Sequence, residues 1–333
     1  MSVIYIREQG AYVHKSGERI VVTKNSDKIL EMPLIHIESI AVFGNVQIST
    51  QVLTMFMENG IDISYFSFSG KYLGHIVSEN SKNIFLRMKQ NSIYQEEAKR
   101  IAIAKKIVWN KIDNQISLIE NYRWKDKEHD WKKQAKQLKQ LQESLKERET
   151  INEILGIEGI CSNIYFDNFA KMFKGDLKFE GRNRRPPKDP INIILSLAYT
   201  MLTKEIGNIV DAEGFESYLG FLHEVRYGRK SLALDLVEEF RQPIVDRLVL
   251  VLFNKNMITK YEFEYLEDGS ITLNENGLKK FYTEYERWIN GTNTISGVES
   301  FRKCIQEQVA SLKRAILKEE EYIPYNWRNK ECM

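Results

Sequence analysis

The sequence predicts an α+β protein in which a β-sandwich-like domain, residues 1–78, is followed by an all-α domain, residues 79–333. Three observations support this organisation. A length of 333 residues fits about two domains of roughly 150 residues each. Short β-branched and aromatic runs recur every 8–12 residues or so in the first part, which is typical of a sandwich or small barrel. From residue 82 onward, apolar residues recur at helical spacing instead.

Composition and charge are those of an ordinary globular protein. The chain is 43% hydrophobic and 28% charged with a net charge of only +2, so its overall charge does not by itself indicate a nucleic-acid binder. Three cysteines without a CxxC pair favour a reducing compartment over a disulfide framework or a zinc site. No signal peptide is recognisable and no apolar run approaches about 18 residues. We therefore expect a soluble, cytoplasmic protein with no membrane segment.

Short strands separated by turn residues are expected throughout residues 1–78. One helix over residues 51–59 interrupts them, because Ser49 and Thr50 supply a capping hydroxyl and Gly60 ends the helix. His14, His36 and His75 fall on separate strands, so no metal cluster is expected here. The expected strands cover residues 3–6, 11–14, 19–23, 28–33, 37–43, 61–68 and 72–77, and the last two form a hairpin across Ser69-Gly70.

A long basic helix is predicted where the β pattern ends. Residues 82–122 contain no Gly or Pro and carry apolar residues at helical spacing. Between residues 82 and 111, eight bases, Lys105, Lys106 and Lys111 among them, stand against two acids. Charge alone leaves two interpretations open, a solvated helix face or a track for nucleic-acid phosphates. The mixed charges of residues 125–148 are typical of a solvated helical hairpin.

The next predicted helix, residues 151–173 with Thr150 as its cap, carries a glutamate between two glycines. Gly156 and Gly159 flank Glu158, and a glycine inside a helix costs roughly 1 kcal/mol relative to alanine. This pattern indicates that another segment approaches the helix backbone beside Glu158; an exposed glutamate on an amphipathic helix is the commoner alternative. An irregular segment, residues 179–190, follows, and its arginines suit phosphate oxygens.

A loop histidine followed by an acidic helix forms a second group of candidate residues. His223 comes after two predicted helices, residues 191–203 and 205–212, and Ser231 is the expected N-cap of the next helix. On that helix Asp235 and Glu238 are three residues apart and project from one face. Carboxylates that face a core need a partner, and the candidates are a metal ion, Arg241 or Lys230.

The remainder of the chain is predicted to be mainly helical. Pro243 predicts a kink or a helix restart, and residues 263–266 and 270–273 predict a β-hairpin with Asp268-Gly269 as its turn. Helices over residues 277–289 and 297–320 follow. The aromatic tail, residues 322–328, is expected to pack on its own domain or on a partner.

The motifs present and absent limit the chemistry. The chain has no GxGxxG after a strand, no Walker A loop, no HExxH and no GxSxG. What remains is one histidine with carboxylates from two helices, a donor set that suits Mg²⁺ or Mn²⁺ better than structural Zn²⁺. Such an ion serves phosphodiester chemistry. From these residues alone, a metal-dependent nuclease and a non-catalytic helical DNA-binding scaffold both stay open.

Four motifs in a fixed order give a more specific indication. They are Leu155-Gly156-Ile157-Glu158-Gly159, then Arg184-Arg185-Pro186-Pro187 with Asp189-Pro190, then Gly220-Phe221-Leu222-His223, and then the run from Ser231 to Arg241. Together they closely resemble the CRISPR-associated integrase of spacer acquisition, a family also described as a CRISPR-associated endonuclease. The resemblance covers essentially the whole chain.

The resemblance implies a division of labour and a reaction. The N-terminal domain would serve dimerisation and partner binding, and the helical domain would be catalytic. A homodimer would join a small ferredoxin-like CRISPR-associated partner in a heterohexamer. The 3′-hydroxyls of a short double-stranded DNA fragment would attack phosphodiesters at the edges of a CRISPR repeat, a transesterification that inserts a new spacer. A general nuclease acting on branched DNA is the other enzymatic alternative.

The resemblance also implies site residues. Family metal ligands correspond to Glu158, His223 and Glu238, with Mg²⁺ or Mn²⁺ as cofactor, and Asp235 matches a second acidic position near the metal. Some relatives have Asp where this chain has Glu238. His223 must be neutral to bind a metal, so activity is expected to fall at acidic pH. The expected phosphate contacts are Arg184, Arg185, Lys230 and the basic helix, including Lys105 and Lys106.

Overall fold

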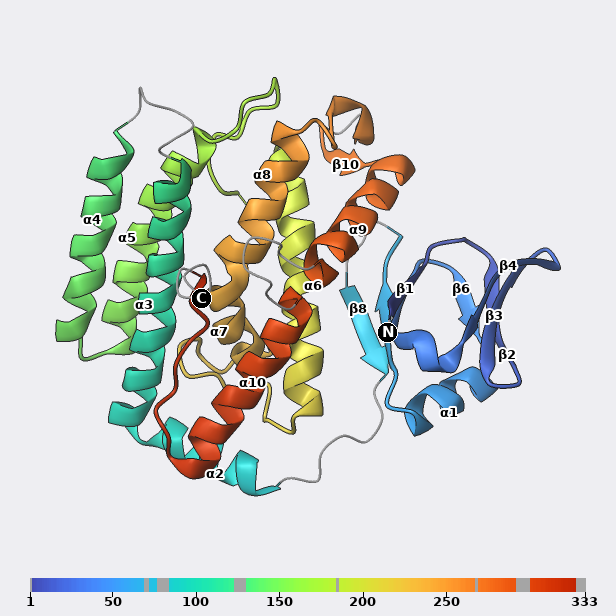
Figure 1. Cartoon of the computed structure of the whole chain (residues 1–333), viewed down its shortest axis with the longest axis horizontal. Coiled ribbons are helices and arrows are strands. Elements are labelled where there is room, and N and C mark those ends of the chain that lie inside the picture. The colour runs from blue at the N-terminus through green and yellow to red at the C-terminus, as the bar shows by residue number, and fades with distance from the viewer. Residues whose placement is uncertain are drawn as a thin grey trace. The chain divides into compact units, whose positions relative to one another are not determined.

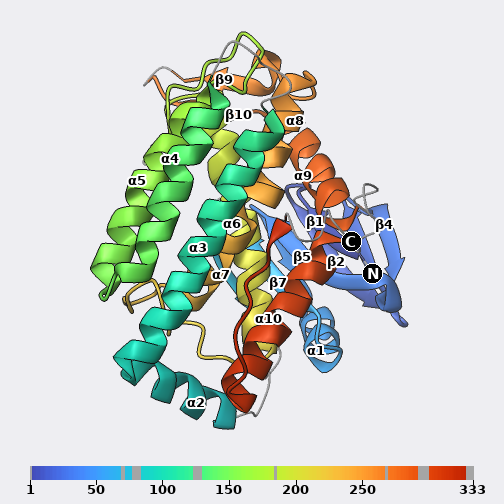
Figure 2. The ribbon, with the colours of Figure 1, turned by 60° about the vertical axis from the view of Figure 1, so that its left-hand side comes forward.

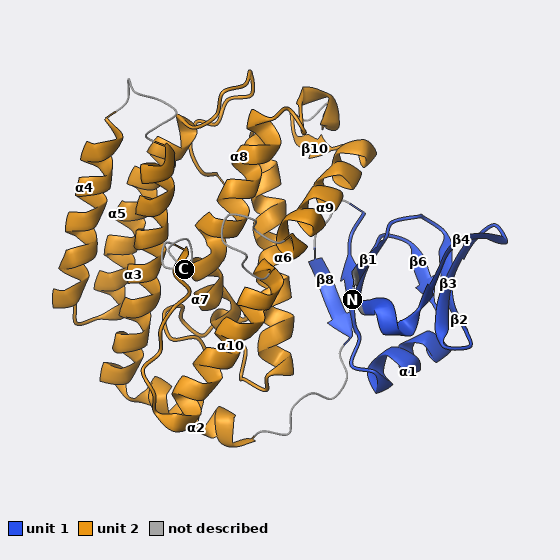
Figure 3. Cartoon of the chain, viewed as in Figure 1, with its two compact units in different colours: residues 1–80 blue, residues 81–333 orange. Residues whose placement is uncertain are grey.

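The computed structural model describes residues 2–68, 72–76, 84–122, 130–183, 186–266, 269–291 and 300–327. The chain forms two compact units, residues 1–80 and 81–333 (Figure 3). The mixed α+β class predicted from the sequence is confirmed, with two sheets in the N-terminal region and helices dominating the rest of the described chain.

Two four-stranded sheets form most of the described N-terminal unit (Figure 1). The first has the strand order β1-β5-β7-β8 and the second the order β4-β3-β2-β6. The strands are β1 Ser2–Ile6, β2 Ala11–Ser16, β3 Arg19–Lys24, β4 Asp27–Pro33, β5 Ile37–Phe43, β6 Val46–Ile48, β7 Asp62–Phe66 and β8 Tyr72–Ile76. Of these, β6 is not among the expected strands, because three residues are too few to show an alternating pattern. It pairs in parallel with β2, as β1 and β7 do with β5.

One apolar core joins both sheets and the helix α1, Thr50–Glu58. The helix begins where Ser49 accepts a hydrogen bond from the Val52 backbone N–H, and it ends before Gly60, whose φ of +67° favours glycine. The expected capping at both ends is therefore confirmed. Residues buried in this core include Ile4, Ile6, Val13, Ile20, Val22, Ile40, Val52 and Phe56.

Helices make up most of the described C-terminal unit. Their bounds are α2 Ile84–Gln95, α3 Glu97–Tyr122, α4 Trp131–Ser144, α5 Ile151–Ala170, α6 Pro190–Ala212, α7 Ser231–Phe240, α8 Arg247–Asn254, α9 Glu275–Asn290 and α10 Phe301–Lys318. Helix α3 packs against α4, α5 and α7, and α6 packs against α7, α8 and α10. Figure 2 shows α3, α4 and α5 side by side. Candidate residues on α3, α5 and α7 are thus brought together although they are far apart in the sequence.

The predicted hairpin near the end of the chain is confirmed. Strands β9, Phe263–Tyr265, and β10, Ile271–Leu273, pair antiparallel, and Asp268 of the predicted turn lies outside the described residues. A π-helical turn over Arg241–Asp246 separates α7 from α8 and contains Pro243, which confirms the predicted interruption.

The single helix expected over residues 82–122 is wrong, because the structure has two helices with a break at Glu96. Gln90 on α2 donates hydrogen bonds to the carbonyl oxygens of Glu216 (3.0 Å) and Leu219 (2.7 Å) and accepts one from the Glu216 backbone N–H (2.9 Å). These bonds attach α2 to the segment that leads to His223. Tertiary contacts have therefore overridden a sequence pattern that would allow one continuous helix.

Helix α6 is one helix where the sequence predicted two, and it is rich in apolar residues. Asp189 caps it by accepting a hydrogen bond from the Asn192 N–H, and Pro190 occupies its first turn, a position that proline favours. Its length and composition would suffice to cross a membrane, but 56% of the apolar window is buried inside the protein. Such burial is typical of the core helix of a soluble protein.

Candidate active site

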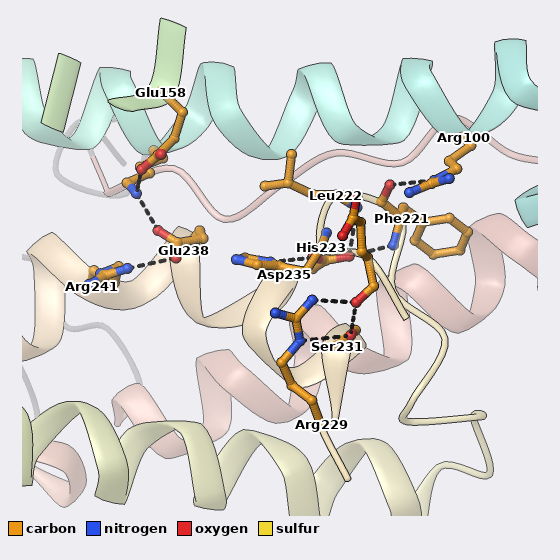
Figure 4. A network of polar contacts seen from close by, with 12 residues as sticks. Arg100, Glu158, Phe221, Leu222, His223, Arg229, Ser231, Asp235, Glu238 and Arg241 are labelled. Carbon is orange, nitrogen blue, oxygen red and sulfur yellow. Dashed lines mark hydrogen bonds and ion pairs between the residues drawn. The ribbon is translucent and has the colours of Figure 1, made fainter. Parts of the chain in front are cut away.

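Two glutamates from different helices share one buried ammonium group. Glu158 lies on α5 and Glu238 on α7 (Figure 4). Lys111 of α3 reaches both, because its Nζ pairs with Glu158 Oε1 and lies 2.6 Å from Glu238 Oε2. Ser162, one turn along α5, also donates a hydrogen bond to Glu158 Oε1 at 2.9 Å. Lys111 is only 3% exposed, so the two carboxylates converge on one cation position inside the helical unit.

Arg241 neutralises the other side of Glu238. Its Nη1 donates a hydrogen bond to Glu238 Oε1 at 2.6 Å, so Arg241 is the partner that the sequence offered for this carboxylate, whereas Lys230 pairs with Asp211 instead. Burial alone would raise the pKa of Glu238, but the charges of Arg241 and Lys111 outweigh it and hold that pKa well below its usual range. Burial likewise opposes ionisation of Glu158, and the charge of Lys111 lowers its pKa below the ordinary value. Both carboxylates are therefore ionised at neutral pH.

Asp235 is fully buried, and both of its oxygens bind the loop that carries His223 (Figure 4). Oδ2 accepts hydrogen bonds from the backbone N–H groups of Phe221 and Leu222, and Oδ1 accepts from the backbone N–H (2.9 Å) and the Nδ1 (2.7 Å) of His223. An ionised carboxylate only accepts hydrogen bonds, so Nδ1 carries a ring proton, and in the neutral ring Nε2 carries the lone pair. A carboxylate that orients a histidine in this way is typical of the support around a metal ligand.

The environment of His223 favours its protonated form. Burial would lower the pKa of the ring, but the hydrogen bond to Asp235 and the charges of Asp235 and Glu238 raise it above the ordinary value. The effect of Glu238 on the ring indicates that His223 belongs to the same electrostatic cluster as the glutamate pair.

The sharp approach of the loop to α7 requires a glycine. A Cβ on Gly220 would lie 2.8 Å from Asp235 Oδ2 and 2.8 Å from the Ser231 carbonyl carbon. By contrast, a Cβ on Gly156 or Gly159 would have nothing within 4 Å. The prediction that another segment approaches the backbone beside Glu158 is therefore wrong; it is the Lys111 side chain that reaches Glu158, and the close backbone approach occurs at Gly220.

These glycines define a matched experiment. Replacing Gly220 with Ala is expected to lower the free energy of unfolding by about 1–3 kcal/mol, because the methyl group must displace Asp235 or the Ser231 backbone. Replacing Gly159 with Ala is expected to be neutral or to stabilise by up to about 1 kcal/mol, since the space is open and alanine favours helix. Urea unfolding measures both changes, and equal destabilisation by the two variants would contradict the assignment.

Three further side chains hold the His223 loop in place. Arg100 of α3 donates a hydrogen bond from Nε to the Phe221 carbonyl at 2.9 Å, and Arg229 and Ser231 both donate to the Glu224 carbonyl (Figure 4). The prediction that Ser231 caps α7 is wrong, because Lys230 occupies the N-cap position and Ser231 is the first helical residue. The Ser231 hydroxyl serves the preceding loop instead of the helix.

A second buried carboxylate lies behind Arg241. Asp246 accepts hydrogen bonds from the hydroxyls of Tyr165 (2.6 Å) and Tyr199. The guanidinium of Arg241 lies 4.4 Å from the centre of the Tyr199 ring. Burial raises the pKa of Asp246, and the two tyrosines and Arg241 counter that rise only in part. This network ties α5 and α6 to the turn that positions Arg241 beside Glu238.

The aromatic tail packs on its own unit in its described part, residues 322–327, which confirms the first of the two expected alternatives. Glu239, the neighbour of Glu238, accepts hydrogen bonds from the Tyr322 hydroxyl and from the Tyr325 backbone N–H (2.8 Å). Asn110 and Asn114 of α3 bind the tail backbone at Tyr325 and Trp327. The tail therefore bridges α3 and α7 beside the glutamate pair, a contact that sequence patterns did not indicate.

Glu239 makes the stability of this bridge depend on pH. Burial raises its pKa from about 4.5 to about 8, despite the opposing hydrogen bonds of the tail. The folded protein thus binds a proton that the unfolded chain releases between these values, so stability from this group is present at low pH and is lost as pH rises through about 8. Glu239→Gln has no such proton, so its free energy of unfolding should fall less than that of the wild type between pH 6 and pH 9. Urea titrations at both pH values test this, with Glu321→Gln, an exposed glutamate of the same tail, as control.

The predicted phosphate contacts have different surroundings. Lys105 donates to the Lys146 carbonyl at 2.9 Å, and Lys106 pairs with Glu321 at 2.7 Å. Arg184 and Arg185 lie outside the described residues. The interpretation of residues 82–111 as one continuous phosphate track is wrong for Lys111, which is buried between carboxylates. The sequence did carry one indication that Lys111 is buried, namely its apolar neighbours. Lys111 follows Ile107 and Val108 and precedes Ile112.

The donor set fits a divalent cation. Glu158 and Glu238 are ionised and converge on a cation position, and the neutral form of His223 presents a lone pair on Nε2. Among the residues that the structure describes, no three His, Cys, Asp or Glu side chains are near enough to hold a metal as they stand. Lys111 takes the cation position between the two glutamates.

A helical unit with ionised buried carboxylates beside an oriented histidine, preceded by a β-rich unit, defines a class of enzyme equipped for phosphodiester chemistry. Comparison with known proteins identifies the family within this class. The family described as "CRISPR associated protein Cas1" matches residues 4–287. The CRISPR-associated endonuclease Cas1 3 of Thermus thermophilus is 35% identical over 295 residues, 87% of this chain and 85% of that protein. The chain therefore belongs to the Cas1 family, and the prediction of a CRISPR-associated endonuclease is confirmed.

Solved structures agree with the fold. A Cas1 protein from Thermotoga maritima has a TM-score of 0.83 and 26% identity, and the match covers 96% of this chain and 99% of that one. A casposase bound to its integration product has a TM-score of 0.84 at 22% identity, over 97% of this chain and 93% of that one. At that identity the casposase shows likeness of fold.

Proposed function

We propose that this chain inserts short double-stranded DNA fragments into a CRISPR array as new spacers, with Glu158, His223 and Glu238 holding one Mg²⁺ or Mn²⁺ ion. The observation that carries the proposal is the convergence of two ionised glutamates, from α5 and α7, on one buried cation position. When bound, such an ion supplies a Lewis acid for the phosphodiester and lowers the pKa of the attacking 3′-hydroxyl.

The protein's own residues prepare this chemistry. Arg241 keeps Glu238 ionised and fixed, and Asp235 orients the His223 ring with its Nε2 lone pair available. Asp235 acts as a positioning residue in this proposal, since both of its oxygens already accept hydrogen bonds from the loop. Burial of the cluster keeps bulk water from screening its charges, so the two carboxylates attract a bound cation more strongly.

DNA would be bound through its phosphates. Lys105, Lys106 and Lys230, with Arg184 and Arg185, are the proposed contacts. The pair between Lys106 and Glu321 involves an exposed acid, and such surface pairs contribute only about 0–1 kcal/mol, so exchange for a phosphate costs little. Phosphate contacts carry no base information, which suits an enzyme that must accept fragments of any sequence.

The working assembly is proposed to be a homodimer that joins a small ferredoxin-like CRISPR-associated partner in a heterohexamer, through residues 1–78. Membership in the Cas1 family supports this proposal. Light scattering of the chain alone and after mixing with the partner would measure both stoichiometries.

Replacing His223 with Ala, or Glu158 with Gln, is expected to reduce strand transfer by at least about 100-fold, since each removes one ligand of the catalytic ion. The assay follows insertion of a duplex with free 3′ ends into a plasmid that bears a CRISPR repeat, with Mn²⁺ present. Glu143→Gln, which removes an exposed acid of α4 that pairs with Lys146, is the control.

The same assay separates the alternatives. Undiminished transfer by His223→Ala would overturn the site assignment. Cleavage of branched DNA at the same rate with or without a repeat would favour the general nuclease over the integrase.

A further inference from the structure

We infer that Lys111 is a resident counter-cation that occupies the metal position between Glu158 and Glu238 until a divalent ion displaces it. The inference rests on the proposed metal site and goes beyond it, because it gives a lysine of α3 a function in assembling that site. Lys111 would hold the two carboxylates together in the metal-free protein and compete with the ion for them.

Geometry supports this role. The Nζ of Lys111 pairs with one oxygen of each glutamate, and the side chains of Lys111 and Glu238 are 4% and 7% exposed. Without a cation, two ionised carboxylates on α5 and α7 would face each other in a poorly solvated interior and repel. A buried lysine with two acidic partners is thus explained as a structural substitute for an ion.

Charge balance explains why the lysine must move. Lys111 and Arg241 together carry two positive charges that neutralise the two negative charges of Glu158 and Glu238. A divalent ion added to this neutral cluster would meet an ammonium group a few ångströms away with little water to screen it. Binding of the ion to both glutamates therefore requires Lys111 to leave them, while Arg241, which binds the other oxygen of Glu238, stays.

Because Lys111 and the divalent ion compete for the two glutamates, Lys111→Met should change metal-free stability and metal affinity in opposite directions. Removing the lysine should lower the melting temperature of the metal-free protein by at least about 6 °C, because the paired glutamates lose their common cation. The same change should tighten Mn²⁺ binding by about tenfold or more, because the ion no longer displaces a positive charge. A lysine that merely supported the fold would give weaker or unchanged Mn²⁺ binding when removed.

The experiment measures two quantities on the full chain without DNA. Mn²⁺ affinity is obtained by calorimetry, and melting temperature is measured in EDTA and at saturating Mn²⁺. Lys139→Met is the matched control, because Lys139 on α4 pairs with Glu120 at 2.7 Å but lies at the surface; it should change neither quantity. If Lys111→Met does not fold without metal, Lys111→Gln, which keeps a polar head without the charge, takes its place.

Each outcome decides the inference. Tighter Mn²⁺ binding with lower metal-free stability supports it, and unchanged or weaker binding in the Lys111 variants overturns it while leaving the metal site standing. Failure of the proposed site gives a different result. In that case the Glu158→Gln variant still binds Mn²⁺ as the wild type does, and this overturns both proposals.

Discussion

Replacing Asp235 with Asn is expected to reduce strand transfer by roughly 10–100-fold, although the residue is proposed to touch neither metal nor DNA. Its two oxygens accept four hydrogen bonds from the loop at residues 221–223. In asparagine an NH₂ group replaces one of the two carboxylate oxygens. The loop N–H groups that donate to that oxygen cannot accept from NH₂, so they lose their hydrogen-bond acceptor and the His223 ring loses its fixed orientation.

Two readouts separate a positioning role from a general loss of structure. The pKa of His223, followed by NMR in the metal-free protein, should fall in Asp235→Asn, because the carboxylate helps to raise it. Mn²⁺ affinity should fall with activity. Glu213→Gln, which loses an ion pair with Lys313 at the end of α6, should leave both readouts unchanged. An unaltered His223 pKa in Asp235→Asn would contradict the proposed role.

Replacing Arg241 with Met is expected to lower the free energy of unfolding by about 3–5 kcal/mol, the range for removing one member of a buried ion pair. Arg241 pairs with Glu238 at 2.6 Å, stacks on Tyr199 and stabilises the charge of the buried Asp246. Methionine fills part of the space but leaves these groups without their cation.

The matched control is an arginine of the neighbouring loop. Arg226 pairs with Glu224 at 3.3 Å, but both side chains are more than half exposed. Arg226→Met should therefore change stability by about 1 kcal/mol or less. Urea unfolding at pH 7 compares the two variants, and similar values for both would show that the buried network contributes little.

Local patterns were sufficient to predict most of the fold. Alternation and turn residues located seven of the eight strands in the described part of the N-terminal unit, and caps such as Ser49 and Thr150 located helix starts. Where prediction failed, tertiary contacts decided the outcome. Helix α2, which is separate from α3, is attached through Gln90 to a segment more than 120 residues away, and no local pattern contains that information.

The site was predictable to the extent that its residues are unusual for their surroundings. Carboxylates beside core residues on α7 indicated a buried cation, and Arg241 was recognised as one candidate. Lys111 was missed because a count of charges treats every lysine as a surface residue, although its neighbours on α3 are apolar. The part played by Glu239 and the tail rests on pairings across 83 and 86 residues, which a single sequence does not reveal.

The bridge between Glu239 and the tail has a consequence for synthesis. A ribosome that adds about 5–20 residues per second needs roughly 4–17 s to proceed from Glu239 to Tyr322, 83 residues later. During that interval the nascent chain contains Glu158, His223 and Glu238 but lacks the aromatic tail that bridges α3 and α7. The proposed catalytic cluster is therefore among the last parts of the helical unit to be completed, and a chain interrupted before Tyr322 carries the proposed ligands without the support that fixes them.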